Sequence, residues 1–423
     1  MIDEKWIINN PDEVKKALLK RGFEVDFSEY LELKQLRNSL LKKIEEVRAL
    51  RNKLSKSIGQ YKREKKDTTE LFAKIDSLKN TISTDEETLK ATETKITEFL
   101  YTIPNTPDED VIEGDKEKNE VISVNKEKPV FDFEIKDHVD LATSLNLVDY
   151  ERAAKISGRG TWIYKNMGAR LEWALINFFI DQHLKDGYEF MMLPHILNYE
   201  SGLTAGQFPK FKDEVFWLEG EEPSKFMLPT AETALINVHR NEILKEEDLP
   251  RKYFAYTPCY RKEVGSYRSQ ERGMIRGYQF NKVEMVQFTK PENTQVAFDE
   301  LMGKAISLMK QLGLHFQVSK LAAGDIAFGM SRTYDLEVWL PSVGIYKEVS
   351  SVSNSRSFQA RRGMMRYKNA DGKVEYLHTL NGSGLATSRL LPAILEQNQQ
   401  ADGSVLVPEV LVPYMGGIKV LKK

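Results

Sequence analysis

The chain has 423 residues, 41% hydrophobic and 29% charged, a composition typical of a globular protein with about two or three domains. Its net charge of −2 excludes a uniformly basic protein, so nucleic acid could be bound only through a local basic surface. Cys259 is the only cysteine, which excludes an intrachain disulfide and favours a reducing compartment. Without a signal-peptide pattern or an apolar run of about 18 residues, we expect a cytoplasmic protein that does not contact the membrane.

Residues 1–102 are predicted to form a helical arm, with a short helix from Pro11 to Arg21 before two long ones. Apolar residues recur at three- and four-residue steps in two runs, which a polar turn separates. The runs are Leu33, Leu36, Leu40, Ile44, Val47, Leu54, Ile58 and Tyr61, then Leu71, Ile75, Leu78, Ile82, Leu89, Ile96 and Leu100. This spacing predicts two antiparallel helices packed as a coiled coil.

Charge is distributed unequally between the two long helices. Residues 31–67 carry 12 Lys or Arg and 5 Asp or Glu, a net charge of +7, whereas residues 70–100 carry 4 and 7, a net charge of −3. The basic helix could follow nucleic-acid phosphates without reading bases, and Lys42, Lys43, Arg48 and Arg51 are its candidate contacts. The alternative is an ordinary solvated coiled coil.

Residues 103–135 are predicted to be a linker, because residues 103–130 contain three prolines and many charged residues. Residues 136–423 are predicted to form one larger domain. Within it, we expect helices at 137–146, 168–185 and 296–312. The segment YEFMMLPHILNYESGL reads as a strand that Pro194 interrupts.

Residues 253–288 are predicted to form two strands joined by a polar loop, since aromatic and β-branched residues fill both ends. Side chains alternate along a strand, so Arg261 and Glu263 would share one face, as would Arg276, Phe280 and Glu284. If the two faces coincide, the guanidiniums could hold a polyphosphate while the phenylalanine ring stacks on a base. The alternative is a ladder of cross-strand ion pairs on a solvated surface.

Two polar segments flank this hairpin in the sequence. Thr230-Ala231-Glu232 opens an expected helix, where threonine suits the N-cap and glutamate suits the first turn. Residues 348–351, Glu-Val-Ser-Ser, end the second of two strands, and a carboxylate with a hydroxyl suits Mg²⁺. On a regular strand Glu348 and Ser351 would face opposite ways, so joint metal contact requires a bulge or the strand's end.

Residues 378–396, HTLNGSGLATSRLLPAILE, are predicted to form a strand, a glycine turn and a helix that carries Arg389. This segment resembles motif 3 of class II aminoacyl-tRNA synthetases. The hairpin RxE…RGMIRGYQFNKVE resembles motif 2 of the same class, in the seryl-tRNA synthetase version. The segment around Pro194 resembles motif 1, the dimer interface of that class. The similarity runs from the arm to the C-terminus, and the three motifs occur in order at family-like spacing.

The resemblance implies an α+β fold. It consists of an N-terminal antiparallel helical coiled-coil arm plus a class II synthetase domain, built on a mixed, mainly antiparallel β-sheet flanked by helices. It also implies a homodimer that activates L-serine with ATP to seryl-adenylate and transfers the seryl group to the 3′ end of tRNA(Ser), and of tRNA(Sec). The arm would grip the tRNA, and ATP and Mg²⁺ would be the cofactors.

The resemblance also assigns site residues. Its ATP site comprises Arg261, Glu263, Arg276, Phe280, Glu348, Val349, Ser350, Ser351 and Arg389, of which Glu348 and Ser351 would hold Mg²⁺. Its serine site comprises Thr230, Ala231, Glu232, Glu284 and Ser383.

The sequence departs from the family at two points. The loop Ser266–Glu271 lacks the Gly-Arg-Asp-Thr core usual there, which bears on how the tRNA acceptor end is discriminated. Ser388 stands where the family often has glycine, which bears on helix-to-sheet packing. Two alternatives stay open: a paralogue with a specialised or non-tRNA acceptor, and a non-catalytic RNA-binding paralogue. The second would be expected to lose residues such as Arg261 or Glu348, which are present.

Overall fold

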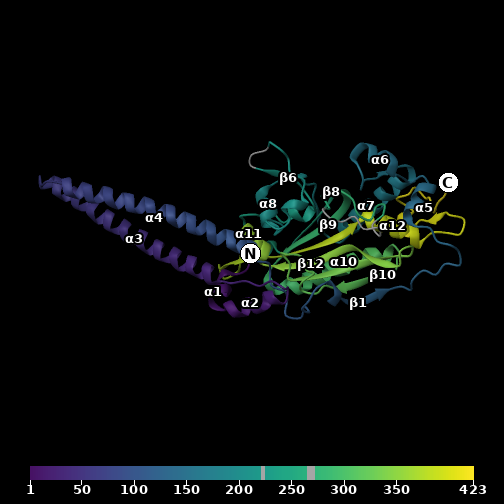
Figure 1. The fold of residues 1–423 in the computed structure, drawn as a ribbon, viewed down its shortest axis with the longest axis horizontal. Coiled ribbons are helices and arrows are strands. Elements are labelled where there is room, and N and C mark those ends of the chain that lie inside the picture. Colours follow the sequence, from purple (N-terminus) through teal and green to yellow (C-terminus); the bar gives the residue numbers. More distant parts are fainter. Residues whose placement is uncertain (221–223, 264–271) are drawn as a thin grey trace. The chain divides into compact units, whose positions relative to one another are not determined.

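The computed structural model describes residues 1–220, 224–263 and 272–423, which form two compact units (Figure 1). The first unit, here called the arm, comprises Glu4–Lys15 and Glu24–Ile103. The second, here called the body, comprises Met1–Asp3, Lys16–Phe23 and Pro104–Lys423. No helix within the described ranges is long and apolar enough to cross a membrane.

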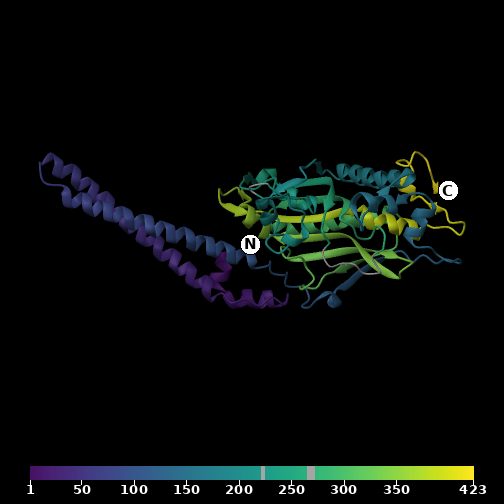
Figure 2. The ribbon, with the colours of Figure 1, turned by 45° about the horizontal axis from the view of Figure 1, so that its top comes forward.

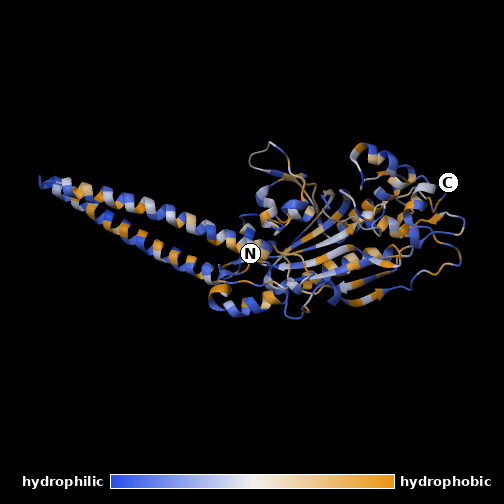
Figure 3. Cartoon of the chain, viewed as in Figure 1, coloured by the Kyte–Doolittle hydropathy of each residue, from blue (hydrophilic) through white to orange (hydrophobic). Residues whose placement is uncertain are grey.

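The arm is built on two antiparallel helices, α3 (Ser28–Arg63) and α4 (Thr69–Thr102), which run side by side in Figures 1 and 2. Each begins just after an aspartate whose carboxylate accepts a backbone N–H of the first turn: Asp26 from Ser28 and Asp67 from Thr69, both at 3.0 Å. Figure 3 shows apolar residues recurring along both helices between hydrophilic ones. The buried seam contains Leu40, Ile44, Ile58, Ile75, Ile82, Ile96 and Leu100, so the predicted coiled coil is confirmed.

The body is built on an eight-stranded sheet in the order β1-β10-β11-β12-β15-β9-β8-β4, antiparallel except for the parallel β4–β8 pair. In that order the strands are β1 (Glu120–Asn125), β10 (Phe316–Lys320), β11 (Arg332–Leu340), β12 (Ile345–Arg356), β15 (His378–Ala386), β9 (Gln279–Thr289), β8 (Arg251–Tyr260) and β4 (Glu189–Phe190). The predicted mixed, mainly antiparallel sheet and the α+β class are thus confirmed.

β1 lies inside residues 103–135, the segment predicted to be a linker. Its backbone pairs with the edge strand β10 from Glu120 to Asn125. Its side chains stay exposed, including Val121, Ile122 and Val124. Because this strand is held by backbone pairing and not by side-chain burial, its sequence lacks the alternation of apolar and polar residues that would predict a strand.

Three helices cover one face of the sheet: α7 (Asn166–Lys185), α10 (Thr294–Gln311) and α12 (Thr387–Gln397). Phe254 of β8 and Met285 of β9 point into the core beneath them. The neighbouring residues on each strand, Ala255 and Glu284, lie opposite each other on the other face. That face carries α9 (Ala231–Leu235) and α11 (Phe358–Gly363), and the candidate site lies there.

The remaining elements are shorter. The helices are α1 (Glu4–Asn9), α2 (Pro11–Leu19), α5 (His138–Ser144), α6 (Tyr150–Ser157) and α8 (Tyr199–Thr204). The strands are β2 (Val148–Asp149), β3 (Ile163–Tyr164), β5 (Ile196–Asn198), β6 (Lys225–Met227), β7 (Ile243–Lys245), β13 (Arg366–Lys368), β14 (Val374–Tyr376), β16 (Val405–Leu406) and β17 (Val420–Leu421).

Candidate active site

A cavity of about 80 Å³ opens where the β8–β9 hairpin meets β12, β15 and α12. It is lined by Arg261, Glu263, Ile275, Arg276, Gly277, Phe280, Lys282, Glu348, Val349, Ser383, Ala386, Ser388 and Arg389. Most of the residues predicted for ATP therefore line one cavity, although they come from three separate stretches of the chain.

The predicted residues of the hairpin's two sides contact one another. The Arg261 guanidinium lies 5.2 Å from the Phe280 ring centroid, and its Nε donates to the Pro229 carbonyl at 3.1 Å. Arg276 Nη1 donates to Glu263 Oε2 at 2.6 Å. These groups line a cavity, which favours the ligand-holding interpretation over a solvated ladder.

The strands are shorter than expected at this point. Because β8 ends at Tyr260 and β9 begins at Gln279, Arg261, Glu263 and Arg276 lie just beyond the strand ends. Glu263 has a positive φ of 50°, a conformation that strand residues do not adopt. Strand alternation therefore explains why Phe280 and Glu284 lie on the same face of the sheet, but it does not explain the position of Glu263.

A β-bulge brings Glu348 and Ser351 to the same side of β12. Glu337 pairs with Glu348 and Leu336 with Ser350, so Val349 is the extra residue. Ser351 Oγ lies 3.1 Å from Glu348 Oε1 and 2.6 Å from Asp335 Oδ1 on the neighbouring strand. The strand thus meets the condition that joint metal contact requires.

Two arginines on the cavity side lie near the Glu348 carboxylate, whose side chain is 46% exposed. Partial desolvation would raise the pKa of Glu348, but the charges of Arg389 and Arg261 and the Ser351 hydroxyl outweigh it, so the pKa is lowered. Asp335 behaves oppositely: burial and the nearby Glu348 charge raise its pKa well above the usual range. Glu348 is therefore the carboxylate that stays ionised and able to bind a cation.

Arg389 is fixed by backbone carbonyls. Its Nη1 donates to the Glu348 carbonyl at 2.7 Å and its Nε to the Ile275 carbonyl at 3.2 Å. The helix α12 presents it at the cavity margin, where a planar guanidinium can stack on a ring or bind phosphate. Ser388 beside it is buried and also lines the cavity, so the larger side chain fits where glycine is usual.

The predicted serine-site residues lie next to this cavity. Ser383 Oγ donates to Glu284 Oε2 at 3.3 Å, because the two residues face each other across β15 and β9. Lys282 Nζ lies 2.6 Å from the same oxygen, and both partners of this ion pair are buried. Thr230 caps α9 and accepts the Glu232 N–H at 3.3 Å, as predicted, and Ala231 follows it fully buried.

Glu232 is a half-buried carboxylate inside this polar cluster. Its Oε1 accepts from Gln359 Nε2 at 2.8 Å and from Asn381 Nδ2 at 3.0 Å. Burial, and then the nearby Glu284 charge, raise its pKa to about 7, while Gln359 and Lys282 act to lower it. The carboxylate is therefore poised between its two protonation states near neutral pH.

Four polar residues of the site were not predicted: Lys282, Asp335, Gln359 and Asn381. The spacing that selected Phe280 and Glu284 also covers Lys282, because every second residue of a strand shares a face. Asn381 stands two residues before Ser383 and could have been found in the same way. Asp335 and Gln359 come from other elements, and their sequence neighbourhoods carry no such signal.

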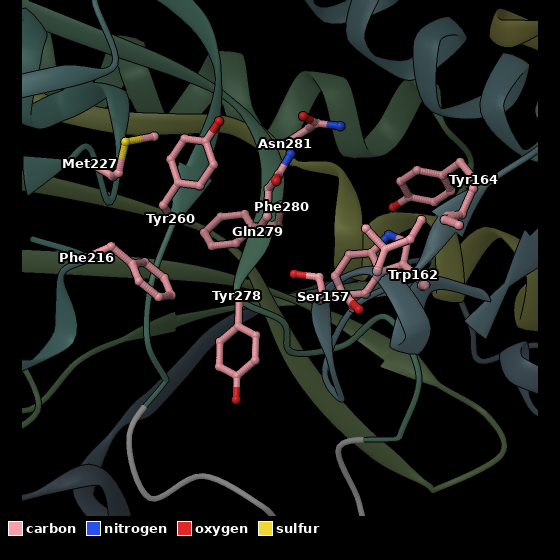
Figure 4. Close-up of a pocket in the computed structure, with 14 residues that line it drawn as sticks. Ser157, Trp162, Tyr164, Phe216, Met227, Tyr260, Tyr278, Gln279, Phe280 and Asn281 are labelled. Atoms are coloured by element: carbon pink, nitrogen blue, oxygen red, sulfur yellow. The ribbon is translucent and has the colours of Figure 1, made fainter. Parts of the chain in front are cut away.

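A second cavity, of about 470 Å³, lies against the same hairpin, with aromatic rings around it (Figure 4). Its lining includes Trp162, Tyr164, Phe216, Tyr260, Tyr278 and Phe280. Asn281 at its wall donates to Glu172 Oε1 at 2.8 Å and accepts from Tyr256 at 3.1 Å. Burial raises the pKa of Glu172 to about 7.

The four candidate tRNA contacts lie on α3 of the arm. Lys43 pairs with Asp85 of α4 at 2.9 Å, and Arg48 pairs with Glu86 at 2.6 Å. These two cations therefore also hold the helices together. Lys42 is exposed, and Arg51 lies 3.3 Å from the amide oxygen of Asn52. The unusual loop Ser266–Glu271 lies outside the described residues.

Comparison with known proteins decides the family. Residues 1–107 match the family described as the seryl-tRNA synthetase N-terminal domain, and residues 216–398 match the class II core domain of the G, H, P, S and T synthetases. Serine–tRNA ligase 2 of Clostridium acetobutylicum is 56% identical over 99% of this chain and 100% of its own length. The chain belongs to the seryl-tRNA synthetase family. The enzyme is an ATP-dependent ligase, a class II aminoacyl-tRNA synthetase.

Solved structures agree with this assignment. A seryl-tRNA synthetase from Pyrococcus horikoshii, solved with ATP, has a TM-score of 0.92 at 32% identity and covers 100% of this chain and 99% of its own. A cytoplasmic serine–tRNA ligase from Naegleria fowleri, solved with AMP, has a TM-score of 0.86 at 27% identity, with 99% and 97% covered. The predicted fold, enzyme class and family of this synthetase are thus confirmed.

Proposed function

We propose that this synthetase joins L-serine to ATP on one face of its sheet and then transfers the seryl group to tRNA(Ser). The observation that carries this proposal is the adjacency of two sites. The cavity lined by Arg261 and Phe280 is also lined by Lys282 and Ser383. Both of these residues contact Glu284, one of the predicted serine-site residues. The complexes of two relatives with ATP and AMP support ATP as the nucleotide.

In the first step, a serine carboxylate oxygen attacks the α-phosphorus of ATP, and the bond to the β-phosphate breaks to release pyrophosphate. Arg261 would hold the α-phosphate, and Arg276 and Arg389 the other ATP groups. Phe280 would stack on adenine, whose amino hydrogens Glu263 would accept. The protein's contribution is positioning and charge stabilisation.

The oxygen donors of Glu348 and Ser351 suit Mg²⁺, because the bulge at Val349 turns both to one side and arginines keep the carboxylate ionised. Mg²⁺, when bound, would supply neutralisation of phosphate charge. Val349 and Ser350 between them are buried, and Ser350 Oγ donates to the Ser383 carbonyl at 2.6 Å, which would keep the pair in position.

Serine recognition would rest on polar partners for its ammonium and hydroxyl groups. Thr230, Ala231, Glu232, Glu284 and Ser383 form this site. Alanine would leave the hydroxyl partners unpaired, a mismatch worth on the order of 10⁴-fold. Threonine would be excluded because the serine site lacks room for it.

In the second step, the terminal ribose hydroxyl of the tRNA attacks the seryl carbonyl and AMP leaves. The arm would bind the tRNA, supported by the net +7 of residues 31–67 and by the N-terminal domain match. The same chemistry would serve tRNA(Sec). The reducing environment that a single cysteine favours supports a cytoplasmic location.

A homodimer is part of this proposal. Trp173 on α7 is 53% exposed, and Met192 and Ile196, near the edge strand β4, are 90% and 51% exposed. Large exposed apolar side chains that follow a sheet edge favour an isologous contact in which two copies bury the same residues.

Serine-dependent exchange of pyrophosphate into ATP, measured beside tRNA charging, tests the proposed function. The proposal expects both activities. Exchange without charging would favour the paralogue with another acceptor, and loss of both would favour the non-catalytic RNA-binding paralogue.

A further inference from the structure

Gln359 is a fully buried amide that no site assignment includes, and each of its polar atoms has a partner. Its Nε2 donates to the Ala205 carbonyl at 2.9 Å and to Glu232 Oε1 at 2.8 Å, and its Oε1 accepts from the Thr379 hydroxyl at 2.7 Å. The reversed amide would set its oxygen against two acceptors. Only one orientation therefore satisfies the group, and that orientation presents a donor to Glu232.

Both amides that reach Glu232 contact the same carboxylate oxygen. Asn381 Nδ2 lies 3.0 Å from Oε1, the atom to which Gln359 donates. The Glu232 backbone N–H is bound by Thr230, so the residue is held at both ends. Both amide donors therefore bind Oε1, and neither of them binds Oε2.

We propose that Gln359 is a positioning residue for serine recognition: it holds Glu232 by Oε1 so that Oε2 receives the substrate ammonium group. The inference rests on the proposed function, in which Glu232 belongs to the serine site. It adds a residue from α11 that acts through the carboxylate rather than by touching the substrate.

The charges around Glu232 explain why such a donor is needed. Burial and Glu284 on β9 favour the neutral acid, whereas Lys282 on β9 and Arg261 beyond β8 favour the carboxylate. The Gln359 hydrogen bond acts with these cations, because a donor to a carboxylate stabilises the ionised form. A neutral Glu232 could not pair with an ammonium group.

The variant Gln359→Met removes the donor at nearly constant volume. Because a hydrogen bond to a charged group is stronger than one between neutral groups, the KM for serine in pyrophosphate exchange should rise at least ~10-fold at pH 7. The KM for ATP should stay within about twofold. The pH below which the serine KM rises should move upward from about 7, since the Glu232 pKa is raised further.

Thr379→Val is the matched control. It also removes a buried hydrogen bond of the Gln359 amide but leaves both donors on Glu232. Its serine KM and pH profile should stay close to those of the parent. If Gln359→Met does not fold, Gln359→Ser leaves room for water at Ala205 and Thr379, and its serine KM should shift in the same direction.

The outcomes separate the two claims. A folded Gln359→Met or Gln359→Ser enzyme with the parent's serine KM and pH profile would overturn the positioning role and leave the proposed function intact. If the serine KM rose equally in Thr379→Val, Gln359 would have only a packing role. A parent enzyme without serine-dependent exchange would instead overturn the proposed function itself.

Discussion

Ser351 Oγ lies 3.1 Å from Glu348 Oε1 although the two residues are three positions apart in the strand, because β12 bulges at Val349. On a regular strand the two side chains would point to opposite faces. Here the Glu348 carboxylate lines a cavity with Arg389 and Arg261, and the Ser351 hydroxyl contacts that carboxylate. The irregularity of the strand thus creates the proposed Mg²⁺ site.

The first prediction concerns that site. Glu348→Gln should raise the Mg²⁺ concentration needed for half-maximal pyrophosphate exchange by at least ~10-fold, because a neutral amide is a far weaker ligand for a hard cation. Direct Mn²⁺ binding, followed by electron paramagnetic resonance in the presence of ATP, should weaken in parallel. Glu337→Gln on the adjacent strand is the control, and unchanged Mn²⁺ affinity in Glu348→Gln would contradict the assignment.

The second prediction concerns Arg261, which contacts the Phe280 ring and the Pro229 carbonyl beside the cavity. Arg261→Ala should lower the rate of adenylate formation by about 10²–10³, the usual effect of removing one charge-stabilising donor. Its thermal unfolding should match the parent. The exposed Arg152, paired with Asp149, provides a control, since Arg152→Ala should exchange pyrophosphate normally. Near-parental exchange by folded Arg261→Ala would refute the role.

Sequence patterns predicted the strand-borne half of the site. Phe280 and Glu284 followed from alternation, and Thr230 from helix capping, because these signals are local to one element. Gln359 and Asp335 could not be predicted, since each matters only through a partner on another strand or helix. The ion pairs of Lys43 and Arg48 were missed for the same reason: the register between two helices cannot be read from either alone.

The third prediction uses Glu172, which is 3% exposed and has a pKa of about 7 against an ordinary value of 4.5. The folded state therefore holds a proton that the unfolded state loses, so Glu172 lowers stability as pH rises from about 4.5 to 7. Glu172→Gln should remove this dependence and stabilise the body at pH 8 by up to about 3 kcal/mol, because a Gln oxygen still accepts from Asn281 and Thr387. Urea unfolding followed by tryptophan fluorescence at pH 5 and pH 8 measures it. A variant that loses stability equally at both values would count against the burial argument.

The fourth prediction tests the homodimer. Met192→Asp should shift sedimentation from dimer to monomer, because a carboxylate at a residue now 90% exposed is tolerated alone but costly when buried against a second copy. Val130→Asp, at a residue 95% exposed outside this edge, is the matched control and should remain dimeric. A parent protein that sediments as a monomer at micromolar concentration would oppose the proposal.

The last prediction concerns the arm. Deleting residues 31–100 should spare serine adenylation and abolish tRNA charging, because every proposed ATP and serine residue lies between Thr230 and Arg389. Neutralising Lys42, Lys43, Arg48 and Arg51 should weaken tRNA binding and flatten its salt dependence. Each lost phosphate contact lowers the log–log slope by roughly 0.7–0.9.

The ion pairs between α3 and α4 make this neutralisation ambiguous by itself, since Lys43 and Arg48 also bind Asp85 and Glu86. The double variant Asp85→Asn and Glu86→Gln breaks the same pairs but leaves the cations on the surface. If the cations act on phosphates, this variant should keep tRNA affinity or raise it, with an unchanged or steeper salt slope. If the cations act only by holding the helices together, the neutralised variant and the double variant should lose tRNA affinity equally. That result would refute the phosphate-binding interpretation of the basic helix, but it would not affect the adenylation activity proposed for the body.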